Sequence, residues 1–266
     1  MISTIKTAIK FFNEQGIHSL NNIPPIKALT KNKKLHQKVF LFTVDDVWEK
    51  TSISNLRKLV RILDEYEVKC TFFITPYYHY DELSAEKAEK LKGILKSHEI
   101  AMHGIRHNRD LMRISPKEGI YELRHCKRFL EKRFNRRIYG YRSPDFLRDR
   151  RLLKELVRSG FLYNSDQFLF RPYPFMLDKM AILPIHDRCD PFALESDESE
   201  ILELIGERLA CSEASGKPYI FLMHPYDLDE KNMSILIKIF EKVKSRGFVT
   251  NLTLGDIAEK LAKRDV

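Results

Sequence analysis

The segment Val39–Asp46 reads VFLFTVDD, and it sets the fold class that we predict for this chain of 266 residues. Its first six positions form an apolar run interrupted only by a threonine, and two carboxylates follow at once. Comparable runs recur at 70–75, 99–103, 138–142, 161–165, 181–185, 219–223 and 249–254. Strands that are buried on both faces of a parallel sheet read as continuous apolar runs of this kind. The sequence therefore predicts a mainly parallel sheet with one strand at each run.

Amphipathic helices are predicted between these strands, and several have clear boundaries. Ser115–Glu118 reads SPKE, which supplies an N-cap serine, a proline at the first helical position and a glutamate that completes a capping box. Asp149 is the predicted N-cap of a second helix that ends near Gly160, and a third helix over Leu236–Val243 ends near Gly247. Alternation at intervals of about 30 residues predicts βαβ units in one α/β domain. The pattern fits both a closed barrel and an open doubly wound sheet.

Residues 1–37 are predicted to form a basic extension, and residues 38–266 the catalytic domain. Residues 1–38 carry seven lysines against one acid, Glu14, whereas the rest of the chain has 39 basic and 36 acidic residues. A nearly balanced body argues against a nucleic-acid groove across the fold. Ile5, Ile9 and Phe12 lie at helical spacing. We expect this short helix to pack on the outside of the domain, with weak contact to an anionic membrane surface as the alternative.

The composition, 43% hydrophobic and 31% charged, is that of a soluble globular protein. The apolar runs are too short to cross a membrane, and the first residues lack the apolar stretch of a secretory signal. We therefore expect a cytoplasmic protein, while the sequence leaves its oligomeric state open. Cys70, Cys126, Cys189 and Cys211 form no CxxC pair, so we expect reduced and mostly buried thiols.

Polar residues with catalytic potential follow five of the predicted strands. They are Asp45 and Asp46, His103 and His107, Arg142 to Asp145, Asp166, and His224. The carboxyl ends of parallel strands share one face of an α/β fold, and active sites are built there. The sequence therefore predicts that these five segments meet at one site.

Two of these groups together suggest a metal site. The imidazoles of His103 and His107 face the same way if the segment turns as a helix. With one carboxylate of the Asp45–Asp46 pair they would supply three ligands and leave a position open for water. Gly104 replaces the glutamate of an HExxH peptidase, so that mechanism lacks its base. Each pair alone also fits an ordinary structural role, as unrelated histidines or as a helix N-cap.

The five segments make the sequence similar to the polysaccharide deacetylases, which are carbohydrate esterase family 4 and include chitin and peptidoglycan deacetylases. The resemblance covers about residues 38–260 and keeps the family's motif order, with Thr43–Asp46, His103–His107, Arg142–Pro144, Asp166 and Leu222–His224. It implies a distorted (β/α)7-type barrel, a bound Zn²⁺ or other divalent transition metal, and removal of N-acetyl groups from amino sugars.

The resemblance also implies a role for each motif residue. Asp46, His103 and His107 would be the metal ligands. Asp45 would be the catalytic base, and Arg142 would hold it in place.

The remaining roles belong to the other side of the expected site. The backbone N–H of Asp145 would contact the oxyanion, His224 would be the general acid, and Asp166 would keep His224 charged. Asp145 and Gln167 stand where the family has aromatic residues, and Gly104 stands where serine or threonine is common. Because stacking surface is lost, we expect a lipid-linked or nucleotide-linked amino sugar or a short oligosaccharide in place of a wall polymer.

Two other functions stay open. One is a hydrolase of the same fold that opens a non-sugar C–N bond, such as an imide or a ureide. The intact set of Asp46, His103 and His107 argues against it. The other is a catalytically silent carbohydrate-binding protein, and the retention of Asp45 and His224 argues against that, because binding alone needs neither a base nor an acid.

Three groups near strand ends have two explanations each. His186–Asp190 would contact substrate or form a salt-bridged loop, and Tyr77–Tyr80 would form a sugar-stacking shelf or cover the barrel rim. Trp48, the only tryptophan, would line the site or serve packing, and we expect packing.

Overall fold

The computed structural model describes residues 37–79, 81–107, 114–146, 150–166, 173–185, 191–193 and 197–263. One sheet contains the strands β1 (Phe40–Val47), β2 (Cys70–Ile74), β5 (Glu99–His103), β6 (Gly140–Arg142), β7 (Tyr163–Asn164), β8 (Phe175–Leu177), β9 (Met180–Ile182) and β10 (Tyr219–Met223). A short hairpin joins β3 (Tyr77–Tyr78) to β4 (Asp81–Glu82). The helices are α2 (Ile53–Glu65), α3 (Ala85–Ile94), α4 (Pro116–Phe134), α5 (Arg150–Arg158), α6 (Glu198–Ser215), α7 (Glu230–Ser245) and α8 (Leu254–Lys263), with 3-10 turns η4 (Pro144–Phe146), η5 (Pro191–Ala193) and η6 (Pro225–Asp227).

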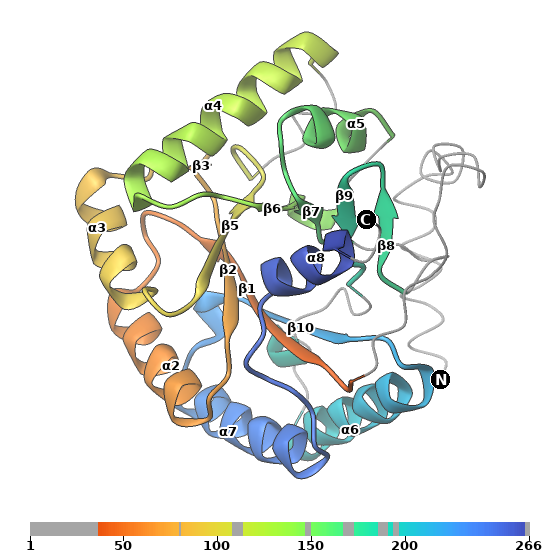
Figure 1. The fold of residues 1–266 in the computed structure, drawn as a ribbon. Coiled ribbons are helices and arrows are strands. Elements are labelled where there is room, and N and C mark those ends of the chain that lie inside the picture. The colour runs from red at the N-terminus through yellow and green to blue at the C-terminus, as the bar shows by residue number, and fades with distance from the viewer. Residues whose placement is uncertain are drawn as a thin grey trace, which may run out of the picture.

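The sheet is an open, curled half-barrel. Its strand order is β10-β1-β2-β5-β6-β7-β9-β8, and every neighbouring pair is parallel except β8 with β9. In Figure 1 the strands curve around α8, while α2, α3, α4, α6 and α7 lie along the outside. The predicted (β/α) barrel class is thus confirmed. The sequence allowed either a closed barrel or an open doubly wound sheet, and the structure is a barrel that is left open between β10 and β8.

Both faces of the sheet are buried, which explains the continuous apolar runs. Alternate residues of β1 belong to different cores: Phe40 and Phe42 pack among the outer helices, and Leu41 packs in the core that contains α8. The α8 residues Leu254 and Ile257 complete this inner core. Helix α8 begins next to Thr71 and Glu99, near the amino ends of β2 and β5, so it closes the end of the barrel opposite to the carboxyl ends of the strands.

One predicted strand is wrong. The run 249–254 forms only an isolated bridge, between Val249 and Val39, and α8 already begins at Leu254. The cause is a reciprocal cap: Asp256 Oδ2 accepts from Thr253 N at 2.8 Å, and Thr253 Oγ1 accepts from Asp256 N at 3.3 Å. The apolar runs did not predict β8 or the β3–β4 hairpin, and β6, β7 and β9 are shorter than predicted.

The predicted start of α4 is confirmed, because Ser115 Oγ accepts from Glu118 N at 3.3 Å and Pro116 opens the helix. Cys70 and Cys126 are buried free thiols, whereas Cys211 is exposed. Within the described residues, no helix combines the length and the apolar character that crossing a membrane requires. Residues 1–36, Asp149 and Cys189 lie outside the described residues.

Candidate metal centre and active site

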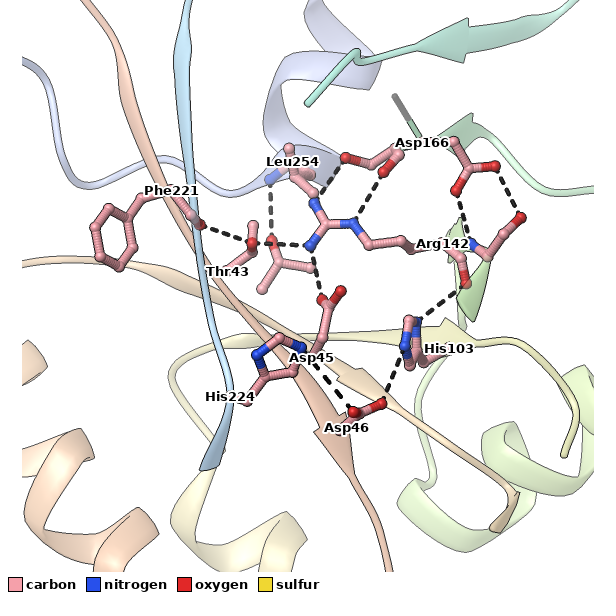
Figure 2. A network of polar contacts seen from close by, with 12 residues as sticks. Thr43, Asp45, Asp46, His103, Arg142, Asp166, Phe221, His224 and Leu254 are labelled. Carbon is pink, nitrogen blue, oxygen red and sulfur yellow. Dashed lines mark hydrogen bonds and ion pairs between the residues drawn. The ribbon is translucent and has the colours of Figure 1, made fainter. Parts of the chain in front are cut away.

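A bulge in β1 directs two adjacent carboxylates into one site. Successive side chains of a regular strand point to opposite faces. Here the register of β1 against β2 shifts between Val44 and Val47, and Asp46 has a left-handed φ of 54°. Figure 2 shows the result: Asp45 points toward Arg142, and Asp46 lies between His103 and His224. Both aspartates are buried.

Asp46, His103 and His107 converge as a metal site would require. The Nε2 atoms of His103 and His107 lie 3.1 Å and 2.7 Å from Asp46 Oδ1. One ligand atom from each residue lies within 4.8 Å of the other two. Two ligands of a tetrahedral zinc ion lie about 3.3 Å apart, given metal–ligand bonds of about 2.0–2.1 Å. Because two nitrogens and one carboxylate oxygen suit zinc and other divalent transition metals, these residues fit such an ion.

The buried oxygen of Asp46 supports this fit. Asp46 Oδ1 is inaccessible to solvent and makes no hydrogen bond of normal geometry with the described residues, despite the two imidazoles that face it. A buried carboxylate oxygen without such a bond is costly unless a cation completes its coordination. Burial by itself raises the pKa of Asp46, but the facing imidazoles outweigh burial and lower that pKa. The carboxylate is therefore ionised and available as a ligand.

His103 is oriented by the neighbouring strand. Its Nδ1 lies 3.2 Å from the carbonyl oxygen of Arg142, which can only accept, so Nδ1 carries the proton and Nε2 is left for a metal. Gly104 has a φ of +61°, and a Cβ there would lie 2.6 Å from Pro144 Cγ. The glycine that departs from the family pattern is therefore required by the close approach of Pro144.

Arg142 and Asp45 form a buried pair. Arg142 Nη1 donates to Asp45 Oδ1 at 2.7 Å and to Thr43 Oγ1 at 2.9 Å. Its Nε and Nη2 atoms donate to the carbonyl oxygen and the Oγ of Ser165 at 2.9 and 2.8 Å. The guanidinium carbon lies 4.1 Å from the centre of the Phe73 ring. Arg142 is thus fixed on several sides, and it presents one nitrogen to Asp45.

Asp166 contacts the turn that follows Arg142. It is fully buried, and it accepts from Ser143 N at 2.7 Å, Ser143 Oγ at 2.8 Å and Asn164 Nδ2 at 2.9 Å. These three donors make Asp166 an anchor for the turn that follows Arg142. Among the described residues, Asp227 brings a carboxylate oxygen to 3.9 Å from His224 Nδ1, and the contact between Asp166 and His224 stays a prediction. Asp227 was not among the predicted site residues, although a histidine followed by Pro-Tyr-Asp predicts a tight turn that brings the two side chains together.

The other two predicted residues lie at the mouth of the site. His224 Nε2 is 4.0 Å from Asp46 Oδ2, on the side away from His103. Asp145 lies in η4 with a φ of 54°, and its side chain is exposed. Tyr226, which the sequence analysis overlooked, is 69% exposed and stacks on His224 with ring centroids 4.9 Å apart.

The structure also places two of the uncertain aromatic residues. Trp48 stacks on Tyr78, and Tyr78 stacks on His107, with ring centroids 4.1 and 4.8 Å apart. Trp48 is partly buried. Its ring makes a packing contact, as we expected, and through Tyr78 it also lies near the candidate ligand His107. Tyr80, Gln167 and His186–Asp190 lie outside the described residues.

Comparison with known proteins agrees with the motifs. The family model of the polysaccharide deacetylases matches residues 32–163. YheN of Bacillus subtilis (strain 168), a protein assigned to the polysaccharide deacetylases, is 23% identical over 251 residues, which cover 92% of this chain and 78% of YheN.

Solved structures share the fold. A protein of Mycobacterium smegmatis assigned to the same family has a TM-score of 0.74 at 19% identity and covers 90% of this chain and 96% of its own. The chitin deacetylase of Colletotrichum lindemuthianum has a TM-score of 0.60 at 19% identity, covering 84% and 88%. The PuuE allantoinase has a TM-score of 0.61 at 15% identity, covering 84% and 89%. In its motifs, in the family model that matches residues 32–163 and in its fold, the chain is similar to the polysaccharide deacetylases.

Proposed function

We propose that this protein is a metal-dependent hydrolase that removes an N-acyl group, in the first instance acetyl, from an amino sugar. The observation that carries the proposal is the convergence of Asp46, His103 and His107 beside a second buried carboxylate, Asp45. Mere carbohydrate binding requires neither the ligand set nor the additional carboxylate.

Each residue has a chemical task in this proposal. A divalent ion on Asp46, His103 and His107 would polarise the amide carbonyl and lower the pKa of the attacking water. Asp45 takes the proton from that water, and its 2.7 Å contact with Arg142 holds the carboxylate in position.

The other two tasks concern the products of the attack. His224 donates a proton to the departing nitrogen, and the backbone N–H of Asp145 stabilises the negative oxygen. The Asp145 side chain is exposed to solvent. The backbone N–H does not depend on the side chain, so an aspartate at this position keeps the donor.

The proposed substrate is a nucleotide-linked or lipid-linked amino sugar or a short oligosaccharide. An exposed carboxylate at position 145 offers no stacking surface for a sugar chain, which disfavours a long wall polymer. We also propose that the enzyme acts in the cytoplasm, and the free buried thiols of Cys70 and Cys126 suit a reducing compartment.

A substrate panel tests this proposal. Acetate or formate release is measured from N-acetylated and N-formylated sugars, sugar nucleotides, glycolipids, chitin and peptidoglycan, and ring opening of allantoin and a cyclic imide is followed by loss of each compound. We expect release from at least one small amino-sugar substrate, and Asp45→Asn should lower kcat about 10²-fold to 10⁴-fold. Turnover of allantoin or the imide alone would instead establish the C–N hydrolase alternative, and turnover of long polymers alone would refute the substrate class.

The role of His224 has its own test. His224→Ala should slow amide hydrolysis strongly, but it should affect 4-nitrophenyl acetate much less, because the nitrophenolate leaves without a proton. Equal losses on the two substrates would show that His224 is not the general acid.

A further inference from the structure

His107 is the most exposed of the three proposed ligands, with 22% of its side chain accessible compared with 4% for His103 and 10% for Asp46. Its backbone is left-handed, with a φ of 53°. The His103 ring is held by the Arg142 carbonyl. In the part of the chain that the structure describes, no comparable hydrogen bond reaches the His107 Nδ1 atom. The contacts made by the faces of this ring are therefore candidates for setting its plane.

We propose that Tyr78 is a positioning residue for the metal ligand His107, and that Trp48 supports Tyr78 in this role. The Tyr78 and His107 rings are nearly parallel, with an interplanar angle of 26° and centroids 4.8 Å apart. Trp48 lies against Tyr78 at 4.1 Å and 22°. Such offset stacking is a favoured aromatic arrangement, and it resists rotation of the imidazole out of the shared plane. The inference rests on the metal site of the proposed function.

The backbone fixes Tyr78 beside the ligand loop. Tyr77 N donates to the carbonyl oxygen of Ile105 at 3.1 Å, and His79 N donates to that of Arg106 at 3.3 Å. The residues on either side of Tyr78 are therefore bonded to the segment between His103 and His107. The small β3–β4 hairpin, which the apolar runs do not predict, thus holds a ring against the second histidine.

The other end of the stack directly follows the strand that supplies Asp46. Trp48 follows Asp46 by two positions, and its backbone N donates to Thr51 Oγ1 at 2.9 Å. Lys50 Nζ lies 5.5 Å from the centre of the Trp48 ring and pairs with Asp81 of β4 at 2.7 Å. The stack therefore joins the two stretches of chain that carry the ligands, and the ion pair joins the residues after β1 to the β3–β4 hairpin.

A sugar-stacking shelf is the alternative role for these rings, and the two roles predict different measurements. If the rings form a shelf, replacing Tyr78 changes the KM for the sugar and leaves metal binding unaltered. If they position His107, replacing Tyr78 changes the geometry and affinity of the metal site in the absence of any sugar. Loss of outer contacts to a ligand histidine typically weakens metal binding about 10-fold to 100-fold.

The test compares Tyr78→Leu and Tyr78→Phe with the wild-type protein. Zn²⁺ affinity is measured by competition with a chelator, and the visible absorption spectrum of the Co²⁺-substituted protein reports ligand geometry. We expect Tyr78→Leu to weaken Zn²⁺ binding at least about tenfold and to alter the Co²⁺ spectrum, whereas Tyr78→Phe keeps the wild-type values. Tyr121→Ala is the matched control, because Tyr121 is an exposed tyrosine of α4 that also stacks on a histidine, His125, which is not a proposed ligand.

Wild-type affinity and spectrum in a folded Tyr78→Leu protein would overturn the inference. If instead the wild-type protein binds neither Zn²⁺ nor Co²⁺, the proposed metal site itself fails, so the two failures are distinguishable. Trp48→Leu is a second test variant. It should also weaken Zn²⁺ binding, but by a smaller factor than Tyr78→Leu.

Discussion

At the scale of single residues, Asp45 and Asp46 are neighbours in sequence and yet meet different partners in one site. The left-handed conformation of Asp46 makes this possible. Such a conformation costs roughly 1–3 kcal/mol in most residues, and aspartate is among the types that tolerate it best. The sequence indicated that two carboxylates follow the strand, but no residue pattern revealed the bulge that aims both of them inward.

Gly104 gives a prediction at this scale. Gly104→Ala should lower the free energy of unfolding by about 2–4 kcal/mol, because the residue has a positive φ and its Cβ would lie 2.6 Å from Pro144 Cγ. Gly93→Ala is the matched control, since nothing lies within 4 Å of the added Cβ in α3. We expect the control to be neutral or stabilising by up to about 1 kcal/mol. Urea unfolding of both variants makes the comparison, and equal stabilities would contradict it.

At the scale of elements, the sequence predicted the long central elements better than the short ones. β5 and β10 have the predicted bounds, because their apolar runs are buried on both faces. The last run failed because the cap between Thr253 and Asp256 starts a helix within it. Strands of two or three residues, such as β7 and β8, are fixed by tertiary pairing that no local pattern reports.

The docking of α8 onto the barrel gives a second prediction. Glu99 accepts from Thr71 Oγ1 at 2.8 Å, Tyr163 OH at 2.9 Å and Gly255 N at 2.9 Å. Glu99→Ala removes the acceptor of all three donors and should cost about 2–4 kcal/mol of stability. Glu99→Gln should cost less, because its amide oxygen still accepts. Thermal unfolding would measure both, and an unchanged Tm in Glu99→Ala would show that α8 does not depend on this contact.

At the scale of the whole molecule, the two ends of the barrel have different tasks. Helix α8 fills the end at the amino termini of the strands, and the candidate ligands gather at the other end. The sequence predicted which strand ends would meet, because parallel topology brings them together. It did not predict the contact of Asp166 with Ser143, or the positions of Asp227 and Tyr226 beside His224, since those contacts depend on side-chain placement after the chain has folded.

Stability against acid is a property of the whole fold, and His98 should contribute to it. Burial lowers the pKa of His98 from 6.5 to about 4, and its Nδ1 accepts from Cys70 N at 3.3 Å. The unfolded chain therefore binds more protons than the folded protein between these two values, so stability rises with pH across this window. The contribution lost by pH 5 is about 2 kcal/mol, and below pH 4 it approaches about 3 kcal/mol.

His98→Asn isolates this effect, because the asparagine oxygen can accept from Cys70 N and does not titrate. Urea unfolding at pH 7.5 and pH 5 should show a smaller loss of stability on acidification in the variant than in the wild type. Equal losses in the two proteins would exclude His98 as the cause.

The metal content of purified protein, measured beside deacetylase activity, tests the proposed metal centre most directly. The wild-type protein reconstituted with Zn²⁺ should retain about one ion per chain, because Asp46, His103 and His107 form a single three-ligand site. Asp46→Ala and His107→Ala should lose both the ion and turnover, whereas Asp45→Asn should keep the ion and lose turnover alone. Full metal retention in Asp46→Ala, or undiminished turnover without the ion, would contradict the assignment.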